Sequence, residues 1–125
     1  MRILVVEPER RPVIKEIDGS LKAMQGIVGG LIQPIPLISD PDTVLVCNDE
    51  GKLLNLPANR GLRDETGQIY DIVCGTFFIC GAPADCDHFT SLTPEQIERY
   101  RERFRTPEMF LGVNGRIVCL PLEID

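Results

Sequence analysis

Most of the short motifs that carry enzyme chemistry are missing from this sequence of 125 residues. It has no glycine-rich phosphate loop, no Walker motif, no dinucleotide fingerprint and no nucleophile elbow. It has a single histidine, His88, and histidine is the most common general acid–base residue, so the sequence offers few candidates for that chemistry. These absences favour a binding protein over an enzyme, and we expect neither a cofactor nor a bound metal.

An excess of positive charge is also missing. The chain carries 13 basic and 19 acidic residues, which gives a formal net charge of −6. A field of this sign repels polyanions and anionic membranes. We therefore expect no direct nucleic-acid partner and no membrane binding.

Long apolar runs are missing as well. The first residues offer only Ile3–Val6 before a charge, which is too short for a signal-peptide core or a membrane span. Without an export signal, the odd number of five cysteines is typical of reduced thiols rather than of a disulfide framework. We expect a cytoplasmic protein.

The composition that is present, 43% hydrophobic and 26% charged, is that of one globular domain spanning 1–125. Strand propensities and turn residues predict an α+β fold with a mostly antiparallel β-sheet and two amphipathic helices. The strands are expected at 3–6, 13–17, 31–38, 44–47, 52–54, 69–80, 109–113 and 116–120, with 55–67 irregular. Two prolines place 31–38 at a sheet edge, and Gly75 is expected to form a bulge in a central strand at 69–80.

The helices have clear ends. The first is predicted to follow a cap at Asp18 or Ser20, with Leu21, Met24 and Val28 on one face, and to end at Gly29. The second has a capping box, a proline in the first turn, an apolar stripe and a proline after its end. Its signals are Thr93, Pro94 and Gln96 at the start, Ile97, Tyr100 and Phe104 in the stripe, and Pro107 beyond.

The end of the chain predicts a β-hairpin. Asn114-Gly115 is the strongest two-residue hairpin signal, and apolar runs flank it on both sides. We expect this C-terminal hairpin to be an added edge and a homodimer contact, because an exposed apolar strand edge invites pairing.

The best candidate site lies in the segment 55–63. Asn59, Arg60 and Arg63 gather a hydrogen-bonding amide and two fixed cations in an otherwise acidic chain, which suits a phosphate or a carboxylate. The alternative is that these arginines pair on the surface with Asp64, Glu65 or Asp71.

A strand feature extends this candidate site. At Gly75, Thr76 and Phe77 a bulge would expose backbone amides and an aromatic ring for a planar ligand, although core packing also explains Phe77 and Phe78. The predicted ligand-binding residues are Asn59, Arg60, Arg63, Asp71, Gly75, Thr76 and Phe77.

A second cluster contains Cys80, Cys86 and His88, with Asp85 and Asp87 between them. The types fit a metal site or a cysteine nucleophile with its base. The spacing matches no closed zinc site, and a catalytic pair would still need an orienting group and oxyanion donors. The cluster is therefore the less favoured hypothesis.

Several segments together resemble a small domain family of unknown function that is common in phages, plasmids and integrated elements of Gram-positive bacteria. They are 1–8 (MRILVVEP), 48–53 (NDEGKL), 56–60 (LPANR), 70–79 (YDIVCGTFFI) and 89–93 (FTSLT). The resemblance implies a phage or bacterial source and no particular activity. It covers a core of 1–107, and 108–125 extends past the usual end. Cys74 and Cys80 stand where smaller or aliphatic residues are usual, which indicates packing roles.

We therefore expect a non-enzymatic binding protein of a mobile element. It would hold a small anionic or nucleotide-like ligand, or a host protein, through Asn59–Arg63 and the Gly75 strand. Two alternatives stay open: an inhibitor that covers a host defence or DNA-handling enzyme, and an enzyme that uses Cys86 and His88.

Overall fold

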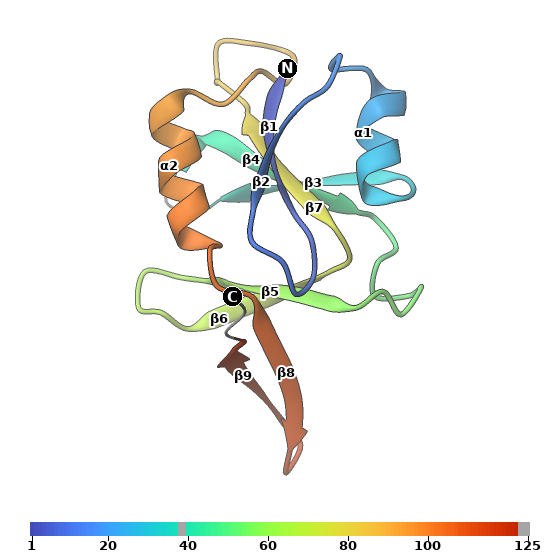
Figure 1. Cartoon of the computed structure of the whole chain (residues 1–125), viewed down its shortest axis with the longest axis vertical. Coiled ribbons are helices and arrows are strands. Elements are labelled where there is room, and N and C mark those ends of the chain that lie inside the picture. Colours follow the sequence, from blue (N-terminus) through green and yellow to red (C-terminus); the bar gives the residue numbers. More distant parts are fainter. Residues whose placement is uncertain (38–39, 123–125) are drawn as a thin grey trace.

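A computed structural model describes residues 1–37 and 40–122. Position 38 of the expected edge strand and the last residues of the C-terminal extension, 123–125, lie outside that range. The described chain forms an α+β fold with antiparallel sheets, two helices and a C-terminal hairpin, as predicted (Figure 1). Its elements are β1 (Arg2–Val6), β2 (Val13–Glu16), α1 (Leu21–Val28), β3 (Ile32–Leu37), β4 (Asp40–Asn48), β5 (Ala58–Arg63), β6 (Ile69–Cys74), β7 (Phe77–Gly81), α2 (Pro94–Arg103), β8 (Glu108–Val113) and β9 (Arg116–Pro121).

The centre is a five-stranded sheet in the order β2-β1-β7-β4-β3, with every neighbouring pair antiparallel. Its inner strands are apolar at successive positions, so both faces are buried. Toward α1 the core contains Ile3, Val5, Met24, Val28, Val44, Val46, Phe78 and Cys80. Toward α2 and β5–β6 it contains Leu4, Val6, Leu45, Phe77, Ile79, Ile97, Tyr100 and Phe104, among others. The two helices therefore lie on opposite faces of one sheet (Figure 1).

Both helices begin where the sequence predicts. Ser20 Oγ accepts from Ala23 N at 3.1 Å, and α1 ends at Gly29 in the left-handed conformation. Thr93 and Gln96 form the reciprocal capping box of α2, with bonds of 2.9 and 3.2 Å. The stripe of α2 is buried as expected, whereas Leu21 of α1 is exposed.

Buried polar contacts also fix α2 to the sheet. The Asp40 carboxylate accepts from Arg99 at 2.6 Å and from the Tyr100 hydroxyl at 2.9 Å. The Tyr100 hydroxyl also lies 2.7 Å from Thr43 Oγ1. The start of β4 therefore holds α2 through paired rather than orphaned polar groups.

Two strand predictions at the margins of the fold are confirmed. The proline-containing β3 lies at the edge of the central sheet, where its missing N–H groups cost no ladder bonds. Asn114 and Gly115 both have positive φ, 50° and 76°, and they join β8 to β9 as a two-residue turn.

Two predictions in the middle of the chain are wrong. The expected strand at 52–54 is a turn, in which Leu54 N donates to Glu50 O at 2.9 Å. The segment 55–67, expected to be irregular, contains β5, which pairs with β6. The strand was hidden because its buried positions include Asn59 and Arg60, which break the apolar alternation that normally marks a strand.

The expected continuous strand at 69–80 is also wrong. Gly75 does not bulge within one strand but has a φ of 86° and separates β6 from β7, which belong to different sheets. Its N–H donates to Pro57 O at 2.7 Å, and the site of a Cβ would lie 2.7 Å from Leu56 Cδ1. Gly75 therefore allows the chain to pass from the second sheet into the central one.

Replacing Gly75 with alanine tests this turn. We expect Gly75→Ala to lower the free energy of unfolding by about 2 kcal/mol, through the strained φ and displacement of Leu56. Gly67→Ala is the matched control, because Gly67 has a φ of 87° with open space around its Cβ position; it should lose only about 1 kcal/mol. Equal losses in urea unfolding would show that contact with Leu56 is unimportant.

Candidate functional site

The predicted ligand residue Arg60 is fully buried. Its Nε–H and one Nη2–H donate to Phe104 O at 3.2 and 2.9 Å, and the other Nη2–H donates to Arg10 O at 2.6 Å. The Nη1 group donates to the carbonyl and the side-chain Oδ1 of Asn59 at 3.2 and 2.9 Å. A guanidinium has five N–H groups, so none is left for a phosphate or a carboxylate.

Asn59 completes this network, which we call the Arg60 knot and define as Asn59, Arg60 and the carbonyls they hold. Asn59 Nδ2 donates to Val6 O at 2.8 Å and to Gly75 O at 2.9 Å. The structure thus brings the predicted residues Asn59, Arg60 and Gly75 together, but their polar groups bind one another and the backbone.

The charge of Arg60 is held by neutral oxygens. Burial lowers its pKa to about 10, although the nearby Glu108 charge acts in the opposite direction. Phe104 follows the last turn of α2, and the carbonyls at a helix C-terminus carry partial negative charge. Arg60, which lies in β5, therefore caps the C-terminus of α2. This is a structural role.

Arg63 anchors the C-terminal hairpin. Its two Nη groups donate to the two oxygens of Glu108 at 3.1 and 2.9 Å. The same carboxylate accepts from Gly61 N at 3.3 Å and from the Cys119 thiol. Burial alone would raise the pKa of Glu108, but the bonds from Arg63 and Cys119 outweigh it and hold that pKa below its ordinary value. Arg63 thus pairs with a residue that the sequence-based alternative did not include.

The remaining predicted residues lie apart from the Arg60 knot or inside the core. Asp71 accepts from Lys52 at 2.7 Å. Phe77 is fully buried with its ring edge-on to Phe104 at a centroid distance of 5.4 Å, and Thr76 is half-buried. Because both faces of β7 are covered, Phe77 and Phe78 are both core residues.

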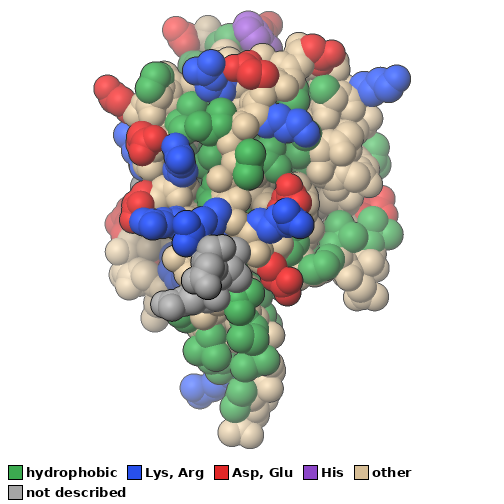
Figure 2. Space-filling model, in the orientation of Figure 1, with side chains coloured by type: hydrophobic (Ala, Val, Ile, Leu, Met, Phe, Trp, Pro, Cys, Tyr) green, Lys and Arg blue, Asp and Glu red, His purple; other side chains and the backbone are tan. Residues whose placement is uncertain are grey.

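An exposed apolar surface lies on the hairpin. One side of β8–β9, which we call the hairpin face, presents five apolar side chains, each 37–47% exposed: Met109, Leu111, Val113, Val118 and Leu120. Figure 2 shows hydrophobic side chains along the projecting hairpin below the body. The sequence contains a signal for this surface, because Arg116 is the only charged residue in 109–121.

A groove lies on the other side of the hairpin, between the ribbon and the second sheet. It encloses about 860 Å³ between β6 and the hairpin. Its lining includes Ile69, Tyr70, Asp71, Phe110, Leu111 and Ile117. Of the predicted ligand residues, Asp71 therefore lines an open surface, and the surroundings are mainly apolar.

The architecture is that of a small α+β domain with helices on both faces of a central sheet and a projecting hairpin. The chain belongs to the family described as Domain of unknown function (DUF3846), which matches residues 1–105. The match ends before β8, so the hairpin lies beyond it. No curated protein and no solved structure matches the chain. Neither helix in the described part of the chain has the length and hydropathy to cross a bilayer.

Removing the Arg60 guanidinium should destabilise the whole fold. We expect Arg60→Met to lower the free energy of unfolding by about 3 kcal/mol or more, because several buried acceptors lose their donors. Arg60→Lys keeps the charge but has fewer donors, so its free energy of unfolding should lie between those of the wild type and Arg60→Met. In the control Arg2→Met, which removes an exposed pair with Glu16, the loss should stay below about 1 kcal/mol. Chemical denaturation measures all three, and a mild effect of Arg60→Met would contradict the structural role.

The stabilisation that Glu108 provides should be lost in acid. The lowered pKa of Glu108 means that its ionised form stabilises the fold above the ordinary value of 4.5, and that this contribution is lost as the pH falls through the lower folded value. At pH 7 we expect Glu108→Gln to cost about 1–2 kcal/mol relative to the wild type.

Urea unfolding at pH 7, 5 and 3 measures this difference. It should be constant from pH 7 to 5 and should shrink at pH 3. The exposed Glu98→Gln variant, which removes an i,i+3 pair with Arg101, should differ little from the wild type throughout. A difference in free energy of unfolding between Glu108→Gln and the wild type that grows toward acid pH would contradict the lowered pKa of Glu108.

Proposed function

We propose that the protein acts by protein–protein association rather than by catalysis, and that the hairpin face is its docking surface. The observation that carries this proposal is the row of five exposed apolar side chains on a ribbon that projects from the body. Exposed apolar surface of this kind marks interaction sites in stable proteins.

The attachment of the hairpin supports this role. Glu108 fixes the base of β8 to Arg63 and Gly61, and Leu122 N donates to Pro107 O at 2.7 Å. Beyond the base, β8 and β9 pair only with each other among the described strands. A two-stranded ribbon is at best marginally stable in water, so covering one of its faces stabilises it.

The partner that fits best is a second copy of the chain. Two hairpin faces related by a two-fold axis would pack apolar side chains against apolar side chains, as an isologous interface requires. In an antiparallel arrangement the two Arg116 side chains, each beside its own hairpin turn, would lie at opposite ends of the interface, so that their charges would not face each other.

The groove beside β6 lies on the opposite side of the ribbon from the hairpin face. Ile69 and Tyr70 are partly exposed at its wall, at 36% and 41%. Phe110 and Ile117 line the groove from that opposite side. A partner that covers the hairpin face would leave the groove open, so the proposed interface is the hairpin face alone.

The geometry gives less support to the other sequence-based hypotheses. The small-anion hypothesis depended on Arg60 and Arg63, whose donors are engaged by Phe104, Asn59, Arg10 and Glu108. In the inhibitor hypothesis, the hairpin face of this chain would bind a host enzyme instead of a second copy of the chain. A phage or plasmid source and a cytoplasmic location stay predictions.

Sedimentation velocity tests the dimer. We expect the full chain to be dimeric at tens of micromolar and to dissociate on dilution. Leu111→Asp, in the middle of the hairpin face, should shift the protein to a monomer and weaken association at least tenfold, because it places a charge in an apolar interface.

Leu53→Asp is the matched control, since Leu53 is 81% exposed on a turn outside the hairpin and the substitution changes the net charge equally. It should leave the dimer intact. A wild-type protein that stays monomeric at hundreds of micromolar would overturn self-association and favour the inhibitor. Equal weakening by both variants would remove the hairpin face as the interface.

A further inference from the structure

A loop at the opposite end of the molecule gathers three different metal-binding groups. The loop spans residues 82–89 and follows β7. Gly81 and Thr90 close it by exchanging two backbone hydrogen bonds, each 2.8 Å long. Inside the loop, Cys86 N donates to Pro83 O at 3.1 Å. The ends of the loop are therefore fixed to the central sheet.

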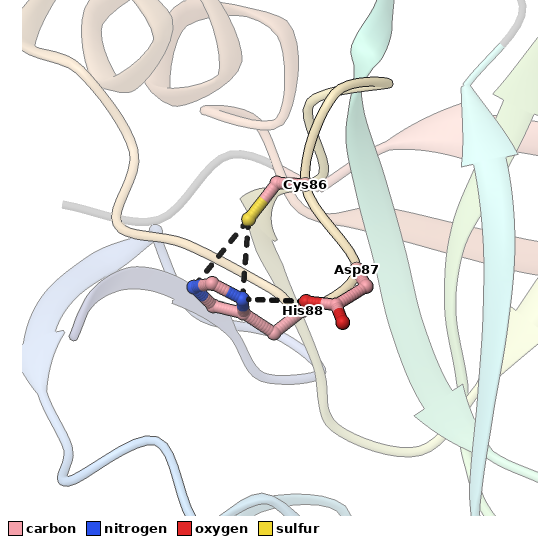
Figure 3. Close-up of side chains that lie close together, drawn as sticks. All are labelled: Cys86, Asp87 and His88. Carbon is pink, nitrogen blue, oxygen red and sulfur yellow. Dashed lines mark hydrogen bonds and ion pairs between the residues drawn. The ribbon is translucent and has the colours of Figure 1, made fainter.

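The side chains of Cys86, Asp87 and His88 converge at the tip of this loop (Figure 3). Cys86 Sγ lies 3.2 Å from His88 Nδ1 and 3.4 Å from Nε2. His88 Nδ1 lies 3.2 Å from Asp87 Oδ1. A thiol, an imidazole and a carboxylate thus offer ligand atoms that all lie within 4.8 Å of one another.

The arrangement differs from a catalytic relay. In a cysteine–histidine–aspartate relay, the thiol and the carboxylate bind opposite nitrogens of the imidazole. Here Nδ1 is the nearest nitrogen to both Sγ and Oδ1. The carboxylate therefore does not orient the ring for proton transfer from the thiol.

The spacing instead fits three corners of a metal coordination sphere. Tetrahedral zinc with S and N bonds of about 2.3 and 2.0 Å separates those two ligand atoms by about 3.6 Å, and N and O ligands by about 3.3 Å. The Sγ–Nδ1 and Nδ1–Oδ1 separations of 3.2 Å are close to these values, and the whole set of ligand atoms lies within 4.8 Å, so rotation of the side chains would bring the three atoms onto one metal.

We propose that Cys86, Asp87 and His88 form a binding site for a divalent transition metal of the zinc class, with a fourth position open. Thiolate and imidazole ligands favour zinc over magnesium or calcium. Binding replaces the S–H bond of Cys86 by a bond from sulfur to the metal, and the proton passes to solvent.

The three residues border a cavity. Cys86, Asp87 and His88 line a recess of about 710 Å³, together with residues such as Met1, Asp18 and Ser91. Three protein ligands and one open position are typical of sites where the metal exchanges a water or a small ligand, whereas structural zinc sites use four protein ligands.

The sequence indicated these three residues but grouped them with Cys80 and Asp85, and that set matched no closed zinc site. Cys80 is fully buried in β7, and burial raises its pKa to about 12, so its thiol belongs to the core. Without Cys80, the cluster is an open site of three consecutive residues, which differs from the closed site that the spacing excluded.

Titration of the full chain with Co²⁺ tests the proposal. One equivalent should give the near-ultraviolet absorption of a thiolate–cobalt bond, and Zn²⁺ should displace the cobalt while Mg²⁺ should not. Cys86→Ser should abolish the absorption. Equilibrium dialysis with Zn²⁺ should show at least a tenfold loss of affinity for Cys86→Ser and also for His88→Ala.

Cys74→Ser is the control, because Cys74 is a half-buried thiol outside the cluster. It should bind both metals as the wild type does. The cluster side chains are on an exposed loop, and circular dichroism should show that every variant keeps the wild-type fold. Absence of stoichiometric binding, or binding that survives either Cys86→Ser or His88→Ala unchanged, would overturn the site.

Discussion

The buried guanidinium of Arg60 is the contact on which the arrangement of layers depends. It joins β5 to the carbonyl that follows α2 and to the turn between β1 and β2, segments 44 and 50 residues away in sequence. A buried charge without partners is costly, so these segments must meet at one point for the charge to be tolerated. The second sheet, α2 and the opening hairpin are therefore fixed to one another by directional bonds as well as by apolar packing.

Features of the fold that obey local rules were predictable from sequence. The capping box at Thr93, the Asn114-Gly115 turn and the proline-containing edge strand each follow from neighbouring residues, and each is present. The strand β5 was not predictable, because Asn59 and Arg60 are polar and their partners are distant in sequence. The sequence predicts a bulge at Gly75, but only the second sheet explains why the chain turns there.

The same distinction applies to the candidate sites. Arg60 and Arg63 have the chemistry of an anion site, yet backbone carbonyls and Glu108 satisfy that chemistry inside the molecule. Sequence identifies residue types, whereas the partner of each cation is set by tertiary structure. The apolar hairpin could be recognised from its lack of charge, and the convergence of Cys86, Asp87 and His88 depended on a loop conformation that no spacing rule encodes.

The position of the hairpin anchor has a mechanical consequence. Arg63 holds Glu108, Arg60 holds Phe104 O, and both arginines belong to β5. Arg103 of α2 also donates to Arg63 O at 3.3 Å. A tilt of the hairpin would therefore pull on the strand that grips the last turn of α2. The hairpin and the end of α2 are thus attached to one strand, and a displacement of Glu108 would act on the helix through the two neighbouring arginines of β5.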